Sequence, residues 1–158
     1  MPTANLGLPQ INGSDIVDYT VFNQAFQTMD VLGKDYVTES AKSGDWWYRK
    51  WKSGRAECGI DRKAFGTVQM QRWLSSGLTI SSGSLDFGPY PFSFIEAPFV
   101  STCFIWSSSP SDAICWTVVR SQGGGTRTPP VYLVDANVNT SQFTGVVLGI
   151  YVCGYWKR

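Results

Sequence analysis

The pattern of apolar and polar positions divides the chain into an aperiodic start, one helical stretch and a long β region. Residues 1–14 hold two prolines and two glycines without sustained periodicity, which indicates an extended arm. Between residues 18 and 32, Phe22, Phe26 and Met29 recur at helical spacing among polar residues, which predicts an amphipathic helix of about three turns. So short a helix is marginal alone, so its apolar stripe must be buried against the following domain or against symmetry-related copies.

Residues 44–59 form the densest aromatic and cationic stretch and predict a β-hairpin, with Lys52, Ser53 and Gly54 as the turn. Its glycine is suited to a positive φ. Strand alternation places Trp47, Arg49 and Trp51 on one face and Trp46, Tyr48 and Lys50 on the other. Two interpretations follow, a ligand platform or a packed hairpin at the core or at a subunit interface. We favour packing, because aromatic residues in strands mostly serve it, and expect Arg49 and Lys50 to add charge at the edge.

The rest of the chain alternates β-like runs with Gly, Ser and Pro clusters, at intervals typical of β-sandwiches. The predicted strands span 34–40, 65–73, 78–81, 100–107, 113–120, 131–135 and 146–156, with a turn at 41–44. We therefore predict a mainly β fold, a small β-sandwich over residues 36–158, preceded by the arm and helix over residues 1–35. Trp73, Phe104 and Trp116 are assigned to its core.

Three connections interrupt the strands. Residues 86–98 are rich in proline and aromatic rings, and the prolines exclude a central strand there. Residues 107–112 form a polar serine loop, and residues 121–130 form a long glycine loop. Because binding usually sits on long loops carried by a rigid scaffold, we take residues from the last two as candidate ligand-binding residues. They are Trp106 and Asp112, which flank the serine loop, and Gln122 and Arg127 in the glycine loop.

Composition limits the classes of partner. The 158 residues fit one domain with a short appended segment, and 16% of them are charged against 15% aromatic, which favours strands and turns. A formal net charge of +1 provides no global field for nucleic acid or an anionic membrane, and the cationic hairpin is more typical of a solvated tip than of a base-stacking platform. No apolar run approaches the ~20 residues that cross a bilayer, and no signal-like segment follows Met1, so we expect synthesis in the cytosol without membrane insertion.

Little in the sequence points to catalysis, and no catalytic residue is predicted. The chain contains no histidine, no nucleophile elbow and no phosphate loop, and its carboxylates form no pair that spacing can identify. The four cysteines are scattered without a metal-binding motif, so we expect no metal and no cofactor. We expect all four to be reduced, with Cys103, Cys115 and Cys153 as small buried hydrophobes; in a secreted protein three disulfide pairings would be open.

Sugars suit the loops better than the other ligand classes. An aromatic ring presents an apolar face to the C–H face of a pyranose, while Asn, Asp, Arg, Ser and Thr side chains hydrogen-bond its hydroxyls. Loops with both kinds of residue also occur in many surface domains that bind no glycan. Composition therefore favours a sugar ligand without assigning one.

Three segments together resemble the C-terminal domain of phage and prophage tail fibres. They are the hairpin at residues 47–59, the crossover Tyr90-Pro91-Phe92-Ser93-Phe94-Ile95-Glu96-Ala97-Pro98, and the ending Gly149-Ile150-Tyr151-Val152-Cys153-Gly154-Tyr155-Trp156. Residues 5–8 and 18–26 are similar to the arm and short helix that precede such tips. One departure is that the crossover begins Tyr90-Pro91 where the family has Phe-Pro.

The resemblance implies a β-sandwich similar to H-type lectin-like tips, assembled as a homotrimer through Phe22, Phe26 and Met29. The arm would join other tail or baseplate proteins, and the protein, assembled in the bacterial cytoplasm, would end in the virion tail. Its expected role is non-enzymatic attachment to bacterial surface polysaccharide or to a teichoic-acid-like polymer. Two alternatives stay open, a structural collar or baseplate component that binds no glycan, and a polysaccharide depolymerase.

Overall fold

The computed structural model describes residues 23–24, 35–72, 80–110, 114–119, 123–136 and 139–158. The chain divides into two compact units, Met1–Tyr36 and Val37–Arg158. In the first unit, the predicted arm and the helix residues Phe22, Phe26 and Met29 lie outside the described residues. Asn23 and Gln24, which are described, are helical and exposed. The proposed role of this unit in oligomerisation therefore stays a prediction.

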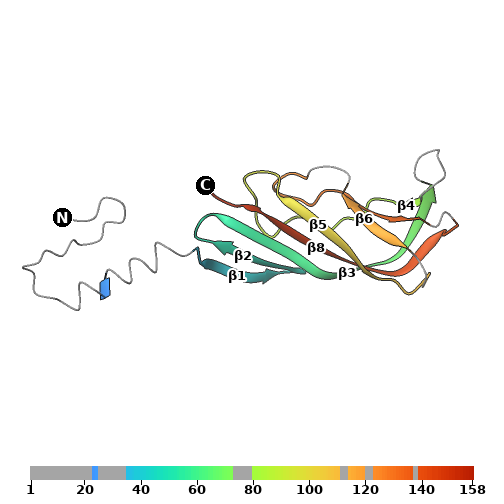
Figure 1. Cartoon of the computed structure of the whole chain (residues 1–158), viewed down its shortest axis with the longest axis horizontal. Helices are drawn as coiled ribbons and strands as arrows, with labels where there is room; N and C mark the ends of the chain where they lie inside the picture. Colours follow the sequence, from blue (N-terminus) through green and yellow to red (C-terminus); the bar gives the residue numbers. More distant parts are fainter. Residues whose placement is uncertain (1–22, 25–34, 73–79, 111–113, 120–122, 137–138) are drawn as a thin grey trace, which may run out of the picture. The chain divides into compact units, whose positions relative to one another are not determined.

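The described part of the second unit is built from antiparallel strands, and the predicted mainly β fold is confirmed (Figure 1). The strands are β1 (Val37–Ser43), β2 (Trp46–Trp51), β3 (Arg55–Arg72), β4 (Ile80–Ser82), β5 (Phe99–Trp106), β6 (Cys115–Val119), β7 (Val131–Asp135) and β8 (Gln142–Tyr155). The predicted hairpin is formed by β2 and β3, and Gly54 in its turn has a φ of 90°.

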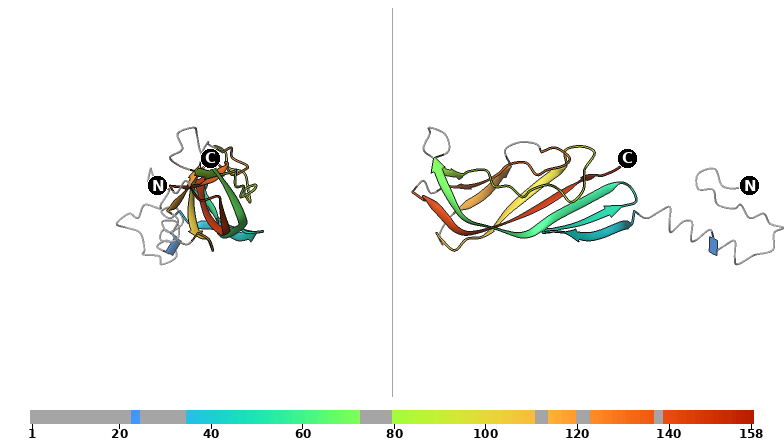
Figure 2. Two further views of the ribbon diagram at one scale, coloured as in Figure 1. Left: turned by 90° about the vertical axis from the view of Figure 1, so that its right-hand side faces the viewer. Right: turned by 180° about the vertical axis from the view of Figure 1, so that it is seen from behind.

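The long strand β3 belongs to two hydrogen-bonded ladders and joins them. Over its first part it lies between β2 and β8, which gives the order β1-β2-β3-β8-β5. Its last residues, from Met70 to Arg72, pair with β4, which leads to β7 and β6. Figures 1 and 2 show β3 running past β2 and β8 and then curling towards β4.

The outermost strands of the two ladders, β5 and β6, meet through their side chains. The Thr102 hydroxyl donates to Oγ1 of Thr117 at 2.8 Å, and the Thr117 hydroxyl donates to the carbonyl oxygen of Thr102 at 3.0 Å. The curled sheet thereby encloses one core, as in a β-sandwich. Its largest fully buried apolar side chains come from both ladders: Phe143, Leu148, Val146 and Val152 of β8, and Leu133 and Val131 of β7.

The crossover at residues 86–98 contributes aromatic rings to this core. It contains no named strand, as its prolines predict. Phe87, Tyr90 and Phe94 are buried, and the Tyr90 ring makes edge contacts with Phe94 at 5.3 Å and with Trp46 of β2 at 5.8 Å between centroids. The crossover therefore covers the inner face of the hairpin.

Several predicted strand ends are shifted by a few residues, and β8, for example, begins at Gln142 rather than at residue 146. Two further boundaries are wrong for a shared reason. The strand predicted at 65–73 is the second part of β3, continuous with the hairpin strand, because the polar residues Asp61 and Arg62 form a bulge rather than a turn. The turn predicted at 41–44 is shorter, since β1 continues to Ser43 and the chain reverses at Gly44, whose φ is 59°. Both errors come from polar residues on an exposed strand, which resemble turn residues in sequence.

The predicted burial of Trp116 in the core is wrong, because this residue is 42% exposed. Strand alternation explains its exposure, because Cys115, Thr117 and Val119 face inward on β6 and Trp116 must face outward. Phe104 packs against the core as predicted, and Trp73 lies outside the described residues.

The four cysteines are free thiols, but the structure corrects their expected burial. Cys103 is exposed, and Cys115 and Cys153 are partly buried, whereas Cys58 is fully buried on β3. The reason is again strand alternation. Cys103 and Cys153 lie on the outward face of β5 and β8, because their neighbours Phe104 and Val152 pack in the core on the other face.

Candidate functional site

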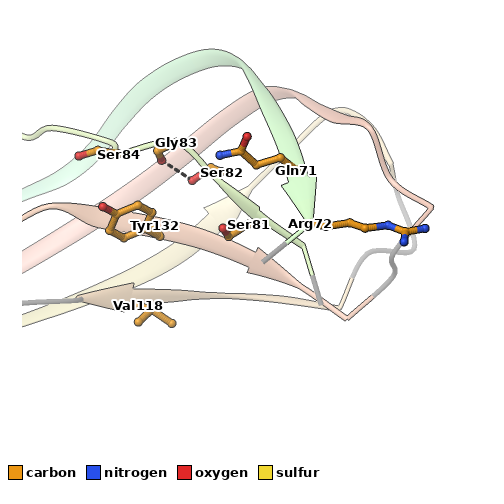
Figure 3. Close-up of a pocket in the computed structure, with 8 residues that line it drawn as sticks. All are labelled: Gln71, Arg72, Ser81, Ser82, Gly83, Ser84, Val118 and Tyr132. Carbon is orange, nitrogen blue, oxygen red and sulfur yellow. Dashed lines mark hydrogen bonds between the residues drawn. The ribbon is translucent and has the colours of Figure 1, made fainter. Parts of the chain in front are cut away.

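A cavity of about 350 Å³ opens beside β4 on the ladder that contains β4, β7 and β6 (Figure 3). Its volume falls in the range of small-molecule sites, roughly 300–1,000 Å³. It is lined by Gln71, Arg72, Ser81, Ser82, Gly83, Ser84, Val118 and Tyr132. In Figure 3 the Gln71 side chain reaches from β3 towards Ser82, and Arg72 extends outward from the end of β3.

Strand register brings these residues together from distant parts of the sequence. Gln71 of β3 pairs with Ser81 of β4, and Val118 of β6 pairs with Tyr132 of β7. Cross-strand partners point to the same face of a sheet. Leu133, the residue after Tyr132, faces the core and is fully buried, so Tyr132 and its partner Val118 face outward.

Hydrogen bonds fix the serine segment that forms one wall of the cavity. The Ser82 hydroxyl donates to the carbonyl oxygen of Gly83 at 2.7 Å and accepts the backbone N–H of Leu133 at 2.9 Å. Ser81 is buried, while Gln71 and Ser84 are exposed. The cavity thus combines a fixed wall with accessible amide and hydroxyl groups and one aromatic ring, and the Arg72 guanidinium lies at its outer edge.

Trp116 enlarges the apolar part of this surface. It pairs with Val134 of β7 and lies two residues before Val118, so it shares the outward face of β6 with a cavity residue. The arrangement of an exposed indole, a tyrosine ring and several hydroxyls suits a ligand with both C–H faces and hydroxyl groups. It has no paired carboxylates or nucleophile–base pair among the described residues that line it.

Trp106, one of the predicted binding residues, is 52% exposed at the end of β5. A bulge between Phe104 and Trp106 interrupts the regular pairing of β5 with β8 just before this residue. Ser108, near the start of the serine loop, is fixed to β8, since its backbone N–H and its hydroxyl both donate to the carbonyl oxygen of Thr144, at 2.8 and 2.9 Å. Asp112, its predicted companion, lies outside the described residues.

Arg127, the other described candidate, forms an ion pair with Asp86 of the crossover. Oδ1 of Asp86 also accepts the N–H of Gly88 at 2.8 Å and the hydroxyl of Thr128 at 3.4 Å. Burial opposes ionisation of this carboxyl, but the Gly88 amide and the Arg127 guanidinium outweigh it and lower the pKa of Asp86. Arg127 therefore ties the glycine loop to the crossover, while Trp106 pairs with Val147 of β8, and among the described contacts no hydrogen bond or ring contact joins Arg127 to Trp106. Gln122 lies outside the described residues.

Lys50 does not supply the edge charge expected of it, because its side chain is only 13% exposed. Its ammonium lies 5.3, 5.0 and 4.8 Å from the ring centroids of Tyr48, Phe92 and Trp156, and 2.9 Å from Oε2 of Glu39. Hydrogen bonds from Lys50 and Tyr48 hold the pKa of Glu39 below its ordinary value. Lys50 therefore fixes the hairpin to the crossover rather than meeting a ligand.

Sequence reasoning missed the cavity. Its residues carry no local motif, and the run Ser81-Ser82-Gly83-Ser84 resembles an ordinary turn. The cavity exists because β4 pairs with β7, where Ile80 is the partner of Asp135. The residues of β7 lie about fifty positions later in the chain than those of β4. Comparisons with protein-family models, curated proteins and solved structures found no match to the chain. Among the described residues no helix is long and apolar enough to cross a membrane.

Proposed function

We propose that this chain is a non-enzymatic virion attachment protein, a tail-fibre tip that binds bacterial surface glycan. The observation that carries the proposal is the cavity beside β4, which combines hydroxyl, amide and guanidinium groups with the Tyr132 ring. The resemblance of the hairpin, the crossover and the final strand to tail-fibre tips supports the viral role.

The chemistry of the cavity suits a sugar. Gln71, Ser84 and Arg72 offer donors and acceptors for sugar hydroxyls, and the Tyr132 ring offers an apolar surface for a C–H face. The outward Trp116 extends that apolar surface along β6. Neither role requires a reaction, which agrees with an attachment function.

We propose further that three copies act together, joined through Phe22, Phe26 and Met29 of the N-terminal unit. Linked copies convert later binding events into intramolecular ones, so individually weak sugar sites suffice for attachment. The N-terminal arm would connect the trimer to other tail or baseplate proteins.

The test compares two variants with the unchanged protein in binding to glycan arrays and to polysaccharide fractions of bacterial envelopes. The double change Gln71→Ala and Arg72→Ala removes two exposed cavity groups, and Arg62→Ala, which removes an exposed arginine from the same strand outside the cavity, is the matched control. We expect the cavity variant to lose binding and the control to retain it, with both equally stable in urea.

Three outcomes contradict the proposal. Absence of binding to every fraction by an intact oligomer would favour a structural collar or baseplate component. Release of reducing sugar from a polysaccharide would identify a depolymerase. Equal binding by the cavity variant and the control would place the glycan elsewhere on the protein.

A further inference from the structure

The outward face of the hairpin carries a second group of aromatic rings, on the ladder that does not contain the cavity. Trp47 of β2 pairs with Gly59 of β3, and Gly59 pairs with Tyr151 of β8. The three residues therefore lie in one row across three strands, with a glycine between two rings. The ring centroids of Trp47 and Tyr151 are 6.1 Å apart and inclined by 40°.

Gly59 provides the space that the Trp47 indole occupies. A Cβ at Gly59 would lie 2.7 Å from Cζ2 and 2.9 Å from Cε2 of Trp47, closer than carbon atoms approach. Any other residue at this position would displace the ring. The edge of the indole that carries its N–H therefore lies directly against the backbone of β3 at Gly59.

Hydrogen bonds lock both rings in place. The indole N–H of Trp47 donates to Oδ1 of Asp61 at 2.8 Å, and the Tyr151 hydroxyl donates to Oε2 of Glu57 at 2.6 Å. Both partners come from β3, on either side of Gly59 along the strand. The two rings therefore form a fixed surface that costs little conformational entropy when a ligand binds.

Charged groups adjoin this surface. The Arg49 guanidinium lies 6.0 Å from the Trp47 ring centroid and 3.6 Å from Oε1 of Glu57, and its side chain is 56% exposed. Asp61, beyond Trp47, is also exposed. Donors and acceptors thus border the two rings, as they do around rings that bind sugars.

We propose that Trp47 and Tyr151 form a second carbohydrate site, which takes one pyranose ring of the surface polysaccharide with its C–H face on the indole. Arg49 and Asp61 would hydrogen-bond hydroxyls at its rim. This inference rests on the proposed glycan attachment and adds a second point of contact to each domain.

A sugar explains the composition of the surface better than a second protein chain does. The core of a protein interface is depleted in charge, because charges buried there lose their hydration. Here Arg49, Glu57 and Asp61 stand next to the rings. Sugar hydroxyls can replace the water around such groups, so a sugar leaves them hydrogen-bonded.

The experiment measures binding of the methyl glycosides of glucose, galactose, mannose and N-acetylglucosamine by saturation-transfer NMR, and of envelope polysaccharide by affinity titration. We expect Trp47→Ala to weaken binding about tenfold, equivalent to ~1.4 kcal/mol. Asp61→Ala, which frees the indole N–H, should weaken it less. Asp61→Asn, whose side-chain oxygen still accepts that N–H, should bind more tightly than Asp61→Ala.

The cavity variant Gln71→Ala with Arg72→Ala separates the two proposals. If the cavity variant loses affinity while Trp47→Ala binds like the unchanged protein, the second site is refuted and the cavity is supported as the glycan site. If Trp47→Ala loses affinity while the cavity variant does not, the second site is supported and the cavity is not the binding site. Absence of binding by the unchanged protein would overturn both, and a change of mass in solution on Trp47→Ala would identify this face as a subunit contact.

Discussion

Replacing Gly54 by alanine tests how tightly the hairpin turn is packed against the segment after β8. Gly54 is buried, has a φ of 90°, and its carbonyl oxygen accepts the backbone N–H of Trp156 at 2.9 Å. A Cβ at this position would overlap the carbonyl oxygen of Lys157. The substitution therefore combines backbone strain with a steric conflict against backbone, which no side-chain rotation relieves.

Gly88 separates the two effects, because its φ is 94° and a Cβ there would meet nothing within 4 Å. Strain alone costs about 1–2 kcal/mol for a left-handed residue, and this is the whole effect expected of Gly88→Ala. At Gly54, overpacking adds about 1–3 kcal/mol. Loss of the hydrogen bond from Trp156 adds about 1 kcal/mol. Gly54→Ala should therefore destabilise the domain by about 3–6 kcal/mol.

Urea unfolding followed by tryptophan fluorescence measures both free energies. Removal of residues 157–158 provides a second check, since it takes away the conflicting carbonyl and should bring the cost of Gly54→Ala towards that of Gly88→Ala. Equal destabilisation by the two alanine substitutions in the full chain would refute the reasoning, because it would mean that the segment after Trp156 moves aside without cost.

Two further predictions concern titrating side chains. Burial raises the pKa of the Cys58 thiol to about 12, while Cys103 is exposed, so iodoacetamide should modify Cys103 in the folded protein and Cys58 only after unfolding; mass spectrometry showing early modification of Cys58 would contradict this. The hydrogen bond to Glu57, with burial, raises the pKa of Tyr151 to about 12 from an ordinary value of 10.0. The contribution of the Tyr151 hydroxyl to the free energy of unfolding is therefore complete below pH 10 and is lost as the pH rises towards 12. The free energy of unfolding should fall more steeply over that interval in the unchanged protein than in Tyr151→Phe. Parallel pH profiles of the two proteins would contradict this contribution.

Local patterns predicted those parts of the fold that depend on neighbouring residues. The hairpin turn at Gly54 follows from its glycine, and β7 begins and ends as predicted, because Pro129 and Pro130 precede Val131 and the apolar run ends at Asp135. The crossover lacks a strand for the same local reason. In each case the signal and the structure lie within a few residues of one another.

The remaining features depend on which face a strand turns inward and on which strand lies beside it. The run Cys115-Trp116-Thr117-Val118-Val119 carries no charged residue, so alternation alone did not decide that Trp116 faces outward. The cavity depends on β3, β4, β6 and β7 meeting. The role of Gly59 beneath Trp47 depends on the register of β2 and β3. The sequence of a single strand does not show which other strand it pairs with or in which register.

The position of β8 determines when the domain can fold during synthesis. It is the last strand in chain order, yet it lies between β3 and β5 and supplies Phe143, Leu148 and Val152 to the core. Until it leaves the ribosome, β3 and β5 have unpaired edges and the core lacks its central strand. A chain released before residues 142–155 are made would therefore expose the apolar side chains of the core that β8 covers.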